Sequence, residues 1–316
     1  MDAFEKVRER SSISIPVIVG PTASGKTGLA LNVAQLDSRV EIISADSRQV
    51  YVGMNIGTAK PSEEILSTIP HHLIDIITPN QTYSAGTFAR DAQTRVDDIL
   101  ARNQIPVVVG GTGFYVRALF EGLAAPAADR EVVAELEERA AKEGYEVLYR
   151  ELLKVDPEAA QMYPKENRVK TYRALACWYQ TGEKYSAFLS SAKEGSHVEP
   201  LVCLILPERE LLYRRINDRV VEMIDQGLIE ETNRLLESGY RPDDPGMRTV
   251  GYKEVLQVLE GKIEESELVP AIQQATRRYA KRQSTWFRNQ LRDCYVVASA
   301  SEGEEWLRGI VERWRN

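Results

Sequence analysis

"GPTASGKT", residues Gly20 to Thr27, carries the strongest structural signal in this 316-residue chain. It follows "IPVIVG" (Ile15 to Gly20), a short apolar run rich in β-branched residues that predicts a buried strand. It runs into "KTGLALNVAQL", where Leu29, Val33 and Leu36 recur at helical spacing. Strand, glycine-containing loop and helix in this order are typical of a phosphate-binding loop, or P-loop.

The loop has the residues that phosphate groups need. Gly20 and Gly25 let the backbone wrap tightly with its N–H groups inward, and the following helix adds its positive end. Lys26 would place a charge on the terminal phosphates, and Thr27 is the expected Mg²⁺ ligand. The predicted phosphate-binding residues are Gly20, Pro21, Thr22, Ala23, Ser24, Gly25, Lys26 and Thr27. Such a loop recognises phosphate rather than adenine, so the substrate stays open.

Four further apolar runs predict strands, and helical patterns separate them. The runs are "VEIISADS" (Val40 to Ser47), "IPVVVGGTG" (Ile105 to Gly113), "PLVCLILP" (Pro200 to Pro207) and "CYVVAS" (Cys294 to Ser299). This alternation predicts an α/β fold, in which a P-loop core is built on a parallel sheet with helices on both faces.

The alternation stops in the middle of the chain. "DREVVAELEERAAKEGYEVLYRELL" and "NRVKTYRALACWYQTGEKYSAFL" are long helical patterns with no strand pattern between them. We therefore predict three parts. Residues 1–120 form the first part of the core, 121–198 an inserted all-helical domain, and 199–316 the second part of the core with basic C-terminal helices.

The distribution of apolar residues along the chain indicates where the protein is located. Hydrophobic residues make up 43% of the chain, which is enough for a large core. No apolar run is long enough to span a bilayer, and the polar N-terminus has no signal-peptide core, so we expect a cytoplasmic protein without membrane contact. The adjacent His71 and His72 have no cysteine or carboxylate constellation around them, which favours a loop or core position over a metal site.

One segment departs from the overall acidity of the chain. The net charge is −7, yet "RRYAKRQSTWFRNQLR" (Arg277 to Arg292) carries six basic residues and no acidic one. A helix over this segment would place Lys281, Arg288 and Arg292 near one face with Arg277, and Trp286 nearer an apolar face. The stripe is either a solvated surface or a binding surface for a nucleic acid.

The strand ends offer one carboxylate near the loop. Nucleotide-hydrolysing P-loop proteins usually end a neighbouring strand in an aspartate that holds Mg²⁺, whereas "IPVVVGGTG" ends in glycines and Thr112. Asp46, in "IISADSRQVY", should face the loop, because ligands bind at the carboxyl ends of the strands in open α/β sheets. Its role is either a helix cap or outer Mg²⁺ contact, or a general base toward a second substrate.

A pair of arginines has two interpretations. Arg215 and Arg219 in "ERELLYRRINDRVVEMI" share one helix face at spacing i, i+4, beside Asp218 and Glu222. They form either a solvated, ion-paired face or a clamp on a diphosphate.

Five segments together resemble one family closely. They are "GPTASGKT", "ISADSRQVYVGMNIGTAKP", "VVVGGTGFYVRAL", "RTVGYKE" and "KRQSTWFR". In this order, along nearly the whole chain, they are similar to the tRNA dimethylallyltransferases, the tRNA isopentenyltransferases that modify adenosine 37. The P-loop alone is unspecific, but the set is highly specific.

The resemblance implies a substrate for the loop and roles for the residues around it. The loop and Arg219 would hold the diphosphate of dimethylallyl diphosphate, with Mg²⁺ on Thr27. N6 of adenosine 37 in the tRNA anticodon loop would attack the allylic carbon while Asp46 orients the amine and accepts its proton. Stabilisation of the leaving diphosphate would supply much of the rate. The catalytic residues implied are Asp46, Thr27 and Arg219.

The resemblance also implies that the helical insertion, residues 121–198, binds tRNA, and it implies a set of tRNA contacts. "NRVKTYRAL" has Lys170 and Tyr172 within a motif that the family usually writes Arg-x-x-Arg-Ala-Leu, while Arg173 matches it. No obligate protein partner is expected, and the protein is expected to be a monomer. The implied tRNA-binding residues are Asp46, Ser47, Arg48, Gln49, Thr112, Arg173, Arg248, Gly251, Tyr252, Lys253, Lys281, Arg282, Gln283, Trp286 and Arg288.

Three other functions share part of these features. A small-molecule or nucleotide kinase shares the loop, Mg²⁺ and sheet but would use ATP. An adenylate isopentenyltransferase shares the chemistry but has no use for a helical insertion or a basic segment. A P-loop scaffold that binds RNA without catalysis would not need Asp46 at a strand end.

Overall fold

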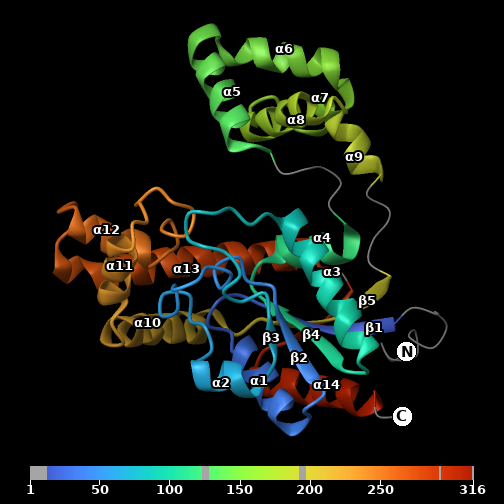
Figure 1. The fold of residues 1–316 in the computed structure, drawn as a ribbon, viewed down its shortest axis with the longest axis vertical. Coiled ribbons are helices and arrows are strands. Elements are labelled where there is room, and N and C mark those ends of the chain that lie inside the picture. Colours follow the sequence, from blue (N-terminus) through green and yellow to red (C-terminus); the bar gives the residue numbers. More distant parts are fainter. Residues whose placement is uncertain (1–12, 123–127, 192–196, 292, 315–316) are drawn as a thin grey trace. The chain divides into compact units, whose positions relative to one another are not determined.

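The computed structural model describes residues 13–122, 128–191, 197–291 and 293–314 (Figure 1). These residues form two compact units. The first contains the described chain up to Tyr83, then Arg90–Val116, and then the chain from His197 onward. The second contains Ser84–Ala89 and the described part of Arg117–Ser196.

The first unit is built on a six-stranded sheet in the order β3-β2-β4-β1-β5-β6, in which every pairing is parallel. The predicted parallel α/β fold is confirmed. β1 lies inside the sheet between β4 and β5, in register with Val17 opposite Val108 and Val202. The strands are β1 (Ile13–Val19), β2 (Val40–Ser44), β3 (His71–His72), β4 (Ile105–Gly110), β5 (Val198–Ile205) and β6 (Cys294–Val297).

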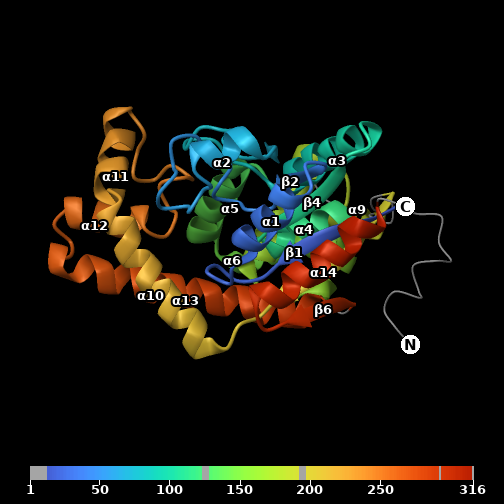
Figure 2. The ribbon, with the colours of Figure 1, turned by 90° about the horizontal axis from the view of Figure 1, so that it is seen from below.

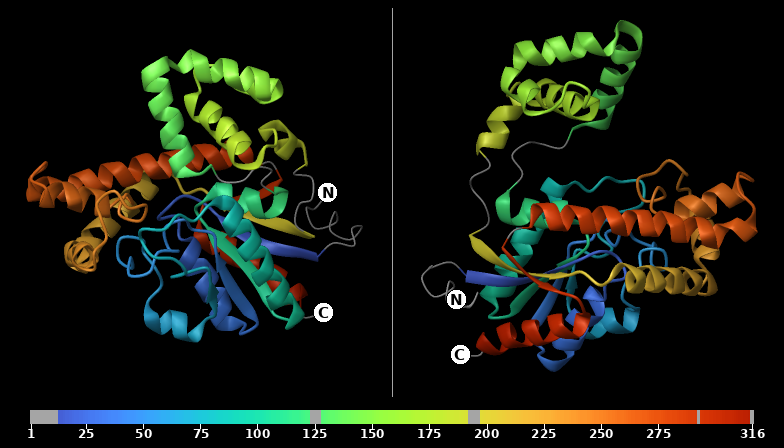
Figure 3. Two further views of the ribbon diagram at one scale, coloured as in Figure 1. Left: turned by 45° about the horizontal axis from the view of Figure 1, so that its top comes forward. Right: turned by 180° about the vertical axis from the view of Figure 1, so that it is seen from behind.

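Helices cover both faces of this sheet. α1 and α14 lie side by side on one face, while α3, α4 and α13 lie on the other (Figures 1 and 3). Right-handed crossovers place α1 on the face opposite to α3, α4 and α13, because the chain moves one way along the sheet after β1 and the other way after β3, β4 and β5. The helices are α1 (Lys26–Leu36), α2 (Glu63–Thr68), α3 (Ala85–Ala101), α4 (Gly113–Glu121), α10 (Arg209–Asp225), α11 (Leu228–Glu237), α12 (Tyr252–Leu259), α13 (Glu265–Gln290) and α14 (Ala300–Arg313).

The described residues of this unit include two large apolar cores. Leu29 and Val33 of α1 are buried with Ile18 and with Leu307 of α14, whereas Leu36 in the last turn of α1 is exposed. A second core lies among α10, α11, α12 and α13, which cluster at one end of the unit (Figure 2). The P-loop is thereby fixed at the carboxyl end of β1, between a packed helix and neighbouring strands. No helix among the described residues is both long and apolar enough to cross a bilayer.

The second unit is helical throughout its described residues. Its core contains Leu136, Leu148, Leu152 and Leu175, which come from three different helices. The buried Asp156 caps one helix and also accepts a hydrogen bond from the Ser186 hydroxyl at 2.6 Å. The remaining helices are α5 (Arg130–Glu143), α6 (Tyr145–Val155), α7 (Pro157–Met162), α8 (Arg168–Thr181) and α9 (Tyr185–Ser191).

Candidate active site

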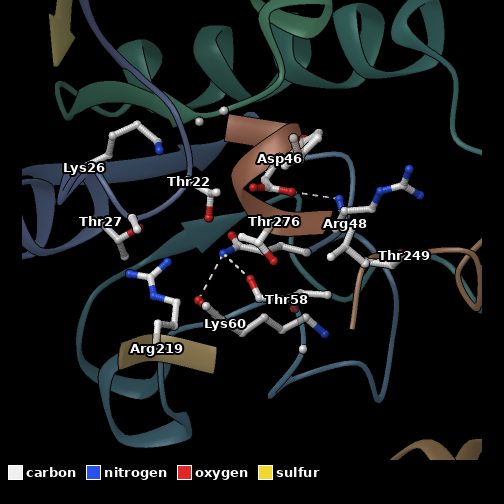
Figure 4. A pocket seen from close by; sticks show the side chains of 18 of the residues that line it. Thr22, Lys26, Thr27, Asp46, Arg48, Thr58, Lys60, Arg219, Thr249 and Thr276 are labelled. Carbon is white, nitrogen blue, oxygen red and sulfur yellow. Dashed lines mark hydrogen bonds between the residues drawn. The ribbon is translucent and has the colours of Figure 1, made fainter. Parts of the chain in front are cut away.

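A cavity of about 730 Å³ opens at the carboxyl ends of β1, β2 and β4. All of its lining residues belong to the first unit. In Figure 4, Lys26, Thr27 and Arg219 lie on one side of the cavity, and Asp46 and Arg48 lie on the other. This is the edge of the sheet where a parallel α/β fold binds its ligands.

The P-loop divides into residues that line the cavity and residues that shape the loop. Thr22, Ala23, Gly25, Lys26 and Thr27 line the cavity. Gly20, Pro21 and Ser24 are not among the described residues that line the cavity, and their contact with the ligand stays a prediction. A Cβ on Gly20 would stand 2.5 Å from the carbonyl oxygen of Ile205, proline has no N–H to donate, and Ser24 is fully buried.

Lys26 is the buried cation of the loop. Its ammonium group donates a hydrogen bond to the carbonyl oxygen of Pro21 at 2.7 Å. Burial lowers the pKa of Lys26 to about 8, the negative charge of Asp46 opposes that shift, and the positive charge of Arg219 adds to it. An anion bound in the loop would relieve the cost of burying this charge.

Thr27 suits the proposed Mg²⁺ ligation. Its exposed side chain lines the cavity beside Lys26. No cluster of three or more His, Cys, Asp or Glu side chains suited to a metal occurs in the described chain. The donor set therefore fits an ion held jointly by a hydroxyl and by the oxygens of a bound diphosphate, rather than a resident metal in an all-protein cage.

Asp46 follows β2 and is half-buried in the cavity wall. Its Oδ1 accepts a hydrogen bond from the backbone N–H of Arg48 at 2.8 Å. The carboxylate thus closes a local turn, which is close to the capping role left open by the sequence. Within the described chain Oδ2 accepts no hydrogen bond, so this oxygen remains for a substrate.

The two predicted arginines of α10 have different surroundings. Arg219 is half-buried and lines the cavity, and burial lowers its pKa. Arg215 is not among the described residues that line the cavity. Of this pair, only Arg219 is among the described residues that line the cavity.

The predicted RNA contacts fall into three groups. Lys281 and Arg288 are exposed on α13, and Arg173 lies in the second unit, where its guanidinium stacks over Tyr185. The Thr112 hydroxyl accepts a hydrogen bond from the N–H of Ser47 at 3.0 Å, so these two residues join the ends of β2 and β4. The predicted contacts that line the cavity are Asp46, Arg48, Gln49, Arg248, Lys253, Arg282 and Gln283.

Gly251 and Tyr252 have internal positions in this structure, and their assignment as RNA contacts stays a prediction. Tyr252 is completely buried, and its hydroxyl donates to the carboxylate of Glu231. Gly251 is buried as well, and its N–H donates to Oε2 of Glu254 at 2.7 Å. Glu231 also accepts the backbone N–H groups of Asn55 and Ile56 at 3.0 Å, so this cluster anchors the loop after β2.

Gln49 and Gln283 are also internal. Gln49 is 9% exposed, accepts from the Ser44 hydroxyl at 2.9 Å and donates to the carbonyl oxygen of Ala59 at 3.3 Å. Gln283 is 8% exposed and bonds to Thr22 and Gly111. Their amide groups form hydrogen bonds within the protein while both residues also line the cavity, and their assignment as RNA contacts stays a prediction.

The basic stripe on α13 is narrower than predicted. Arg277 is half-buried and donates to Oδ1 of Asn217 at 2.6 Å, so it points to α10 rather than along the stripe. Arg292 lies outside the described residues. Trp286 packs against the apolar surface, with its ring centroid 5.8 Å from that of Phe114.

The packing of α13 explains why β4 ends in glycines. A Cβ on Gly113 would stand 2.0 Å from the ring of Trp286, and a Cβ on Gly111 would stand 2.6 Å from Nε2 of Gln283. An aspartate side chain has no room at either position. Neither glycine could therefore be replaced by an aspartate unless α13 moved.

Two residues of the cavity had no predicted role. Lys60 donates to Oδ1 of Asn55 at 3.0 Å and pairs with Asp75, which holds the loop after β2. Burial raises the pKa of Tyr279 to about 12, with a further contribution from the charge of Asp46. "GTAKP" and "RRYAKRQ" contain these residues, but no spacing rule singles them out.

Comparisons with known proteins agree with one another. A family model described as IPP transferase matches residues 49–290. The tRNA dimethylallyltransferase 2 of Geotalea uraniireducens is 47% identical over 277 residues, which are 87% of this chain and 89% of that protein. The crystal structure of the full-length tRNA isopentenylpyrophosphate transferase from Bacillus halodurans is 35% identical, with a TM-score of 0.67 over 96% of this chain and 98% of that one. A eukaryotic dimethylallyltransferase acting on tRNA is 28% identical, with a TM-score of 0.77 over 96% and 77% of the two chains.

Proposed function

Because the chain belongs to the IPP transferase family, we propose that it transfers the dimethylallyl group of dimethylallyl diphosphate to N6 of adenosine 37 in the anticodon loop of tRNA. One observation carries the proposal. A P-loop and the carboxylate of Asp46 line the same cavity from opposite sides. This arrangement suits a reaction in which an amine loses a proton on one side while diphosphate leaves on the other.

The proton transfer is assigned to Asp46. The N6 amine of adenine is a poor nucleophile, because its lone pair is delocalised into the ring, and it becomes acidic as the new C–N bond forms. Since Oδ1 is held by the N–H of Arg48, Oδ2 is the oxygen that orients the amine and takes its proton. An anticodon-loop base is only partly stacked, so it can turn out into such a cavity.

Stabilisation of the leaving group is assigned to the opposite wall. As the bond between the allylic carbon and the diphosphate oxygen breaks, negative charge builds on the diphosphate. The loop N–H groups, Lys26 and Arg219 are placed to stabilise that charge. When bound through the Thr27 hydroxyl, Mg²⁺ would supply further positive charge to the diphosphate.

The RNA is proposed to bind along the exposed basic residues of α13. Lys281, Arg282 and Arg288 are exposed on this helix, while the chain as a whole has a net charge of −7. We further propose that the protein acts in the cytoplasm as a monomer, without an obligate protein partner.

Ligand and acceptor competition tests the proposal against its rivals. Calorimetry should show that dimethylallyl diphosphate binds with Mg²⁺ and that ATP competes poorly. In transfer assays with a radiolabelled allylic group, label should enter tRNA but not adenosine monophosphate. Preferential binding of ATP, with phosphoryl transfer, would favour a kinase, and label on free adenylate would favour an adenylate isopentenyltransferase.

A further inference from the structure

The side chain of Gln283 joins two loops at the floor of the cavity. Its Oε1 accepts a hydrogen bond from the backbone N–H of Thr22 at 2.9 Å. Its Nε2 donates to the carbonyl oxygen of Gly111 at 2.9 Å. Gln283 lies on α13, Thr22 in the P-loop and Gly111 at the end of β4, so one carboxamide connects three segments that are far apart in the sequence.

The chemistry of this junction requires an amide. The N–H of Thr22 is a hydrogen-bond donor and the carbonyl oxygen of Gly111 is an acceptor, and a carboxamide can bond to both at once. An ionised carboxylate of the same length would satisfy Thr22 but would set its second oxygen against the carbonyl oxygen of Gly111. The side chain is 8% exposed, so water replaces a lost partner poorly.

The hydrogen bond also changes what the P-loop offers to a ligand. The N–H of Thr22 is occupied by Gln283 and is not available to a phosphate oxygen. The side chain of Thr22 still lines the cavity. The first half of the loop is therefore held in place by a residue of α13 at the wall of the cavity, and that residue can act without touching the diphosphate.

We propose that Gln283 is a positioning residue for the P-loop, and that it fixes the loop backbone in the conformation that binds diphosphate. The inference rests on the proposed function in one respect, that the loop holds a diphosphate. Replacing Gln283 should therefore lower the affinity for diphosphate and leave the affinity for RNA unchanged. Its neighbours Lys281, Arg282 and Arg288, by contrast, are exposed basic residues.

Two substitutions at one position test this, with inorganic diphosphate and Mg²⁺ as the probe. Gln283→Leu should weaken diphosphate binding about tenfold at every pH, because both hydrogen bonds are lost. Gln283→Glu should show a similar loss of diphosphate affinity at pH 8.5, and at pH 5.5 its affinity should approach that of the wild type. A protonated carboxyl group can accept from Thr22 and donate to Gly111, as the amide does.

Affinity should be expressed as the ratio of variant to wild type at each pH, which cancels the titration of diphosphate and of Lys26. Gln274→Leu and Gln274→Glu are matched controls, since Gln274 is exposed on the same helix and does not line the cavity. Both should bind diphosphate as wild type does. Affinity for tRNA alone, and the melting temperature, should be measured for every variant.

The outcomes separate this inference from the proposed function. Recovery of Gln283→Glu at low pH with unchanged tRNA affinity would support it, even if wild-type protein failed to modify tRNA. Wild-type diphosphate affinity in Gln283→Leu would overturn it. A loss of diphosphate affinity in Gln283→Glu that does not change with pH would also overturn it. The same holds if the variants lose affinity for tRNA alone. If Gln283→Leu fails to fold, the pH profile of Gln283→Glu decides alone.

Discussion

The ammonium group of Lys26 lies 2.7 Å from the carbonyl oxygen of Pro21, within its own loop. Burial lowers the pKa of Lys26 to about 8, so the charge on which the P-loop depends is only moderately stable in the free protein. A bound diphosphate would hold the proton on Lys26, because it places negative charge beside the ammonium group. Diphosphate binding and protonation of Lys26 are therefore linked.

The linkage predicts that affinity for dimethylallyl diphosphate falls as pH rises above about 8. The free protein loses the Lys26 proton in that range while the complex retains it, so the decline approaches about tenfold per pH unit. Calorimetry between about pH 7 and pH 9.5 measures it. Lys26→Arg stays charged and should lack the decline, and equal slopes for the two proteins would refute the assignment.

Asp46→Asn should cut transfer to tRNA by about two to four orders of magnitude, the usual effect of losing a general base. Affinity for dimethylallyl diphosphate should stay close to wild type at neutral pH. The asparagine Oδ1 can still accept from the N–H of Arg48, so the local turn survives. Single-turnover rates with saturating tRNA are the measurement, and near-normal rates would leave Asp46 with its turn-closing role alone.

Reversing two exposed charges on α13 should weaken tRNA binding and flatten its dependence on salt. For each RNA phosphate that Lys281→Glu/Arg288→Glu no longer neutralises, the slope of log affinity against log salt should decrease by about one unit. Affinity for dimethylallyl diphosphate should not change, because neither residue lines the cavity.

Lys262→Glu/Arg308→Glu is the matched control for net charge. Both residues are exposed, and neither belongs to the cavity or to α13. Filter binding at several salt concentrations should show a weaker and flatter profile for the α13 variant than for this control. Identical profiles for the two variants would make the α13 stripe an ordinary solvated surface.

Tyr252→Phe should lower the free energy of unfolding by about 1–2 kcal/mol and leave tRNA affinity unchanged. The hydroxyl that is removed donates to Glu231 in a fully buried setting, where the carboxylate also holds the loop after β2. Urea denaturation and tRNA binding measured on the same protein separate stability from recognition. A variant of normal stability with weak tRNA binding would identify Tyr252 as an RNA contact.

The sequence predicted the strands whose apolar pattern matches their burial in the sheet. β1 and β4 are buried over most of their length, so a short apolar run predicted each of them. β3 was not predicted, because a strand of two histidines has no pattern, and it exists through its pairing with Ile42 and Ile43 of β2. Strand pairing at a sheet edge is a tertiary effect that local sequence does not encode.

The sequence predicted those residues of the cavity that belong to a short motif or directly follow a strand. Lys26 and Thr27 belong to one short motif, and Asp46 follows a recognisable strand, so all three were placed at the cavity in advance. The internal hydrogen bonds of Gln283 and Tyr252 were not predicted, because the direction of a side chain on α12 or α13 depends on what packs against that helix. A motif identifies the segment, whereas packing decides which of its residues face inward.

Mass spectrometry of adenosine 37 in unmodified tRNA, after incubation with the protein, dimethylallyl diphosphate and Mg²⁺, tests the proposed transfer. We expect N6-isopentenyladenosine at that position, release of one diphosphate per modified tRNA, and loss of the product with Asp46→Asn. Unmodified adenosine 37 under these conditions, with wild-type protein that binds both ligands, would contradict it.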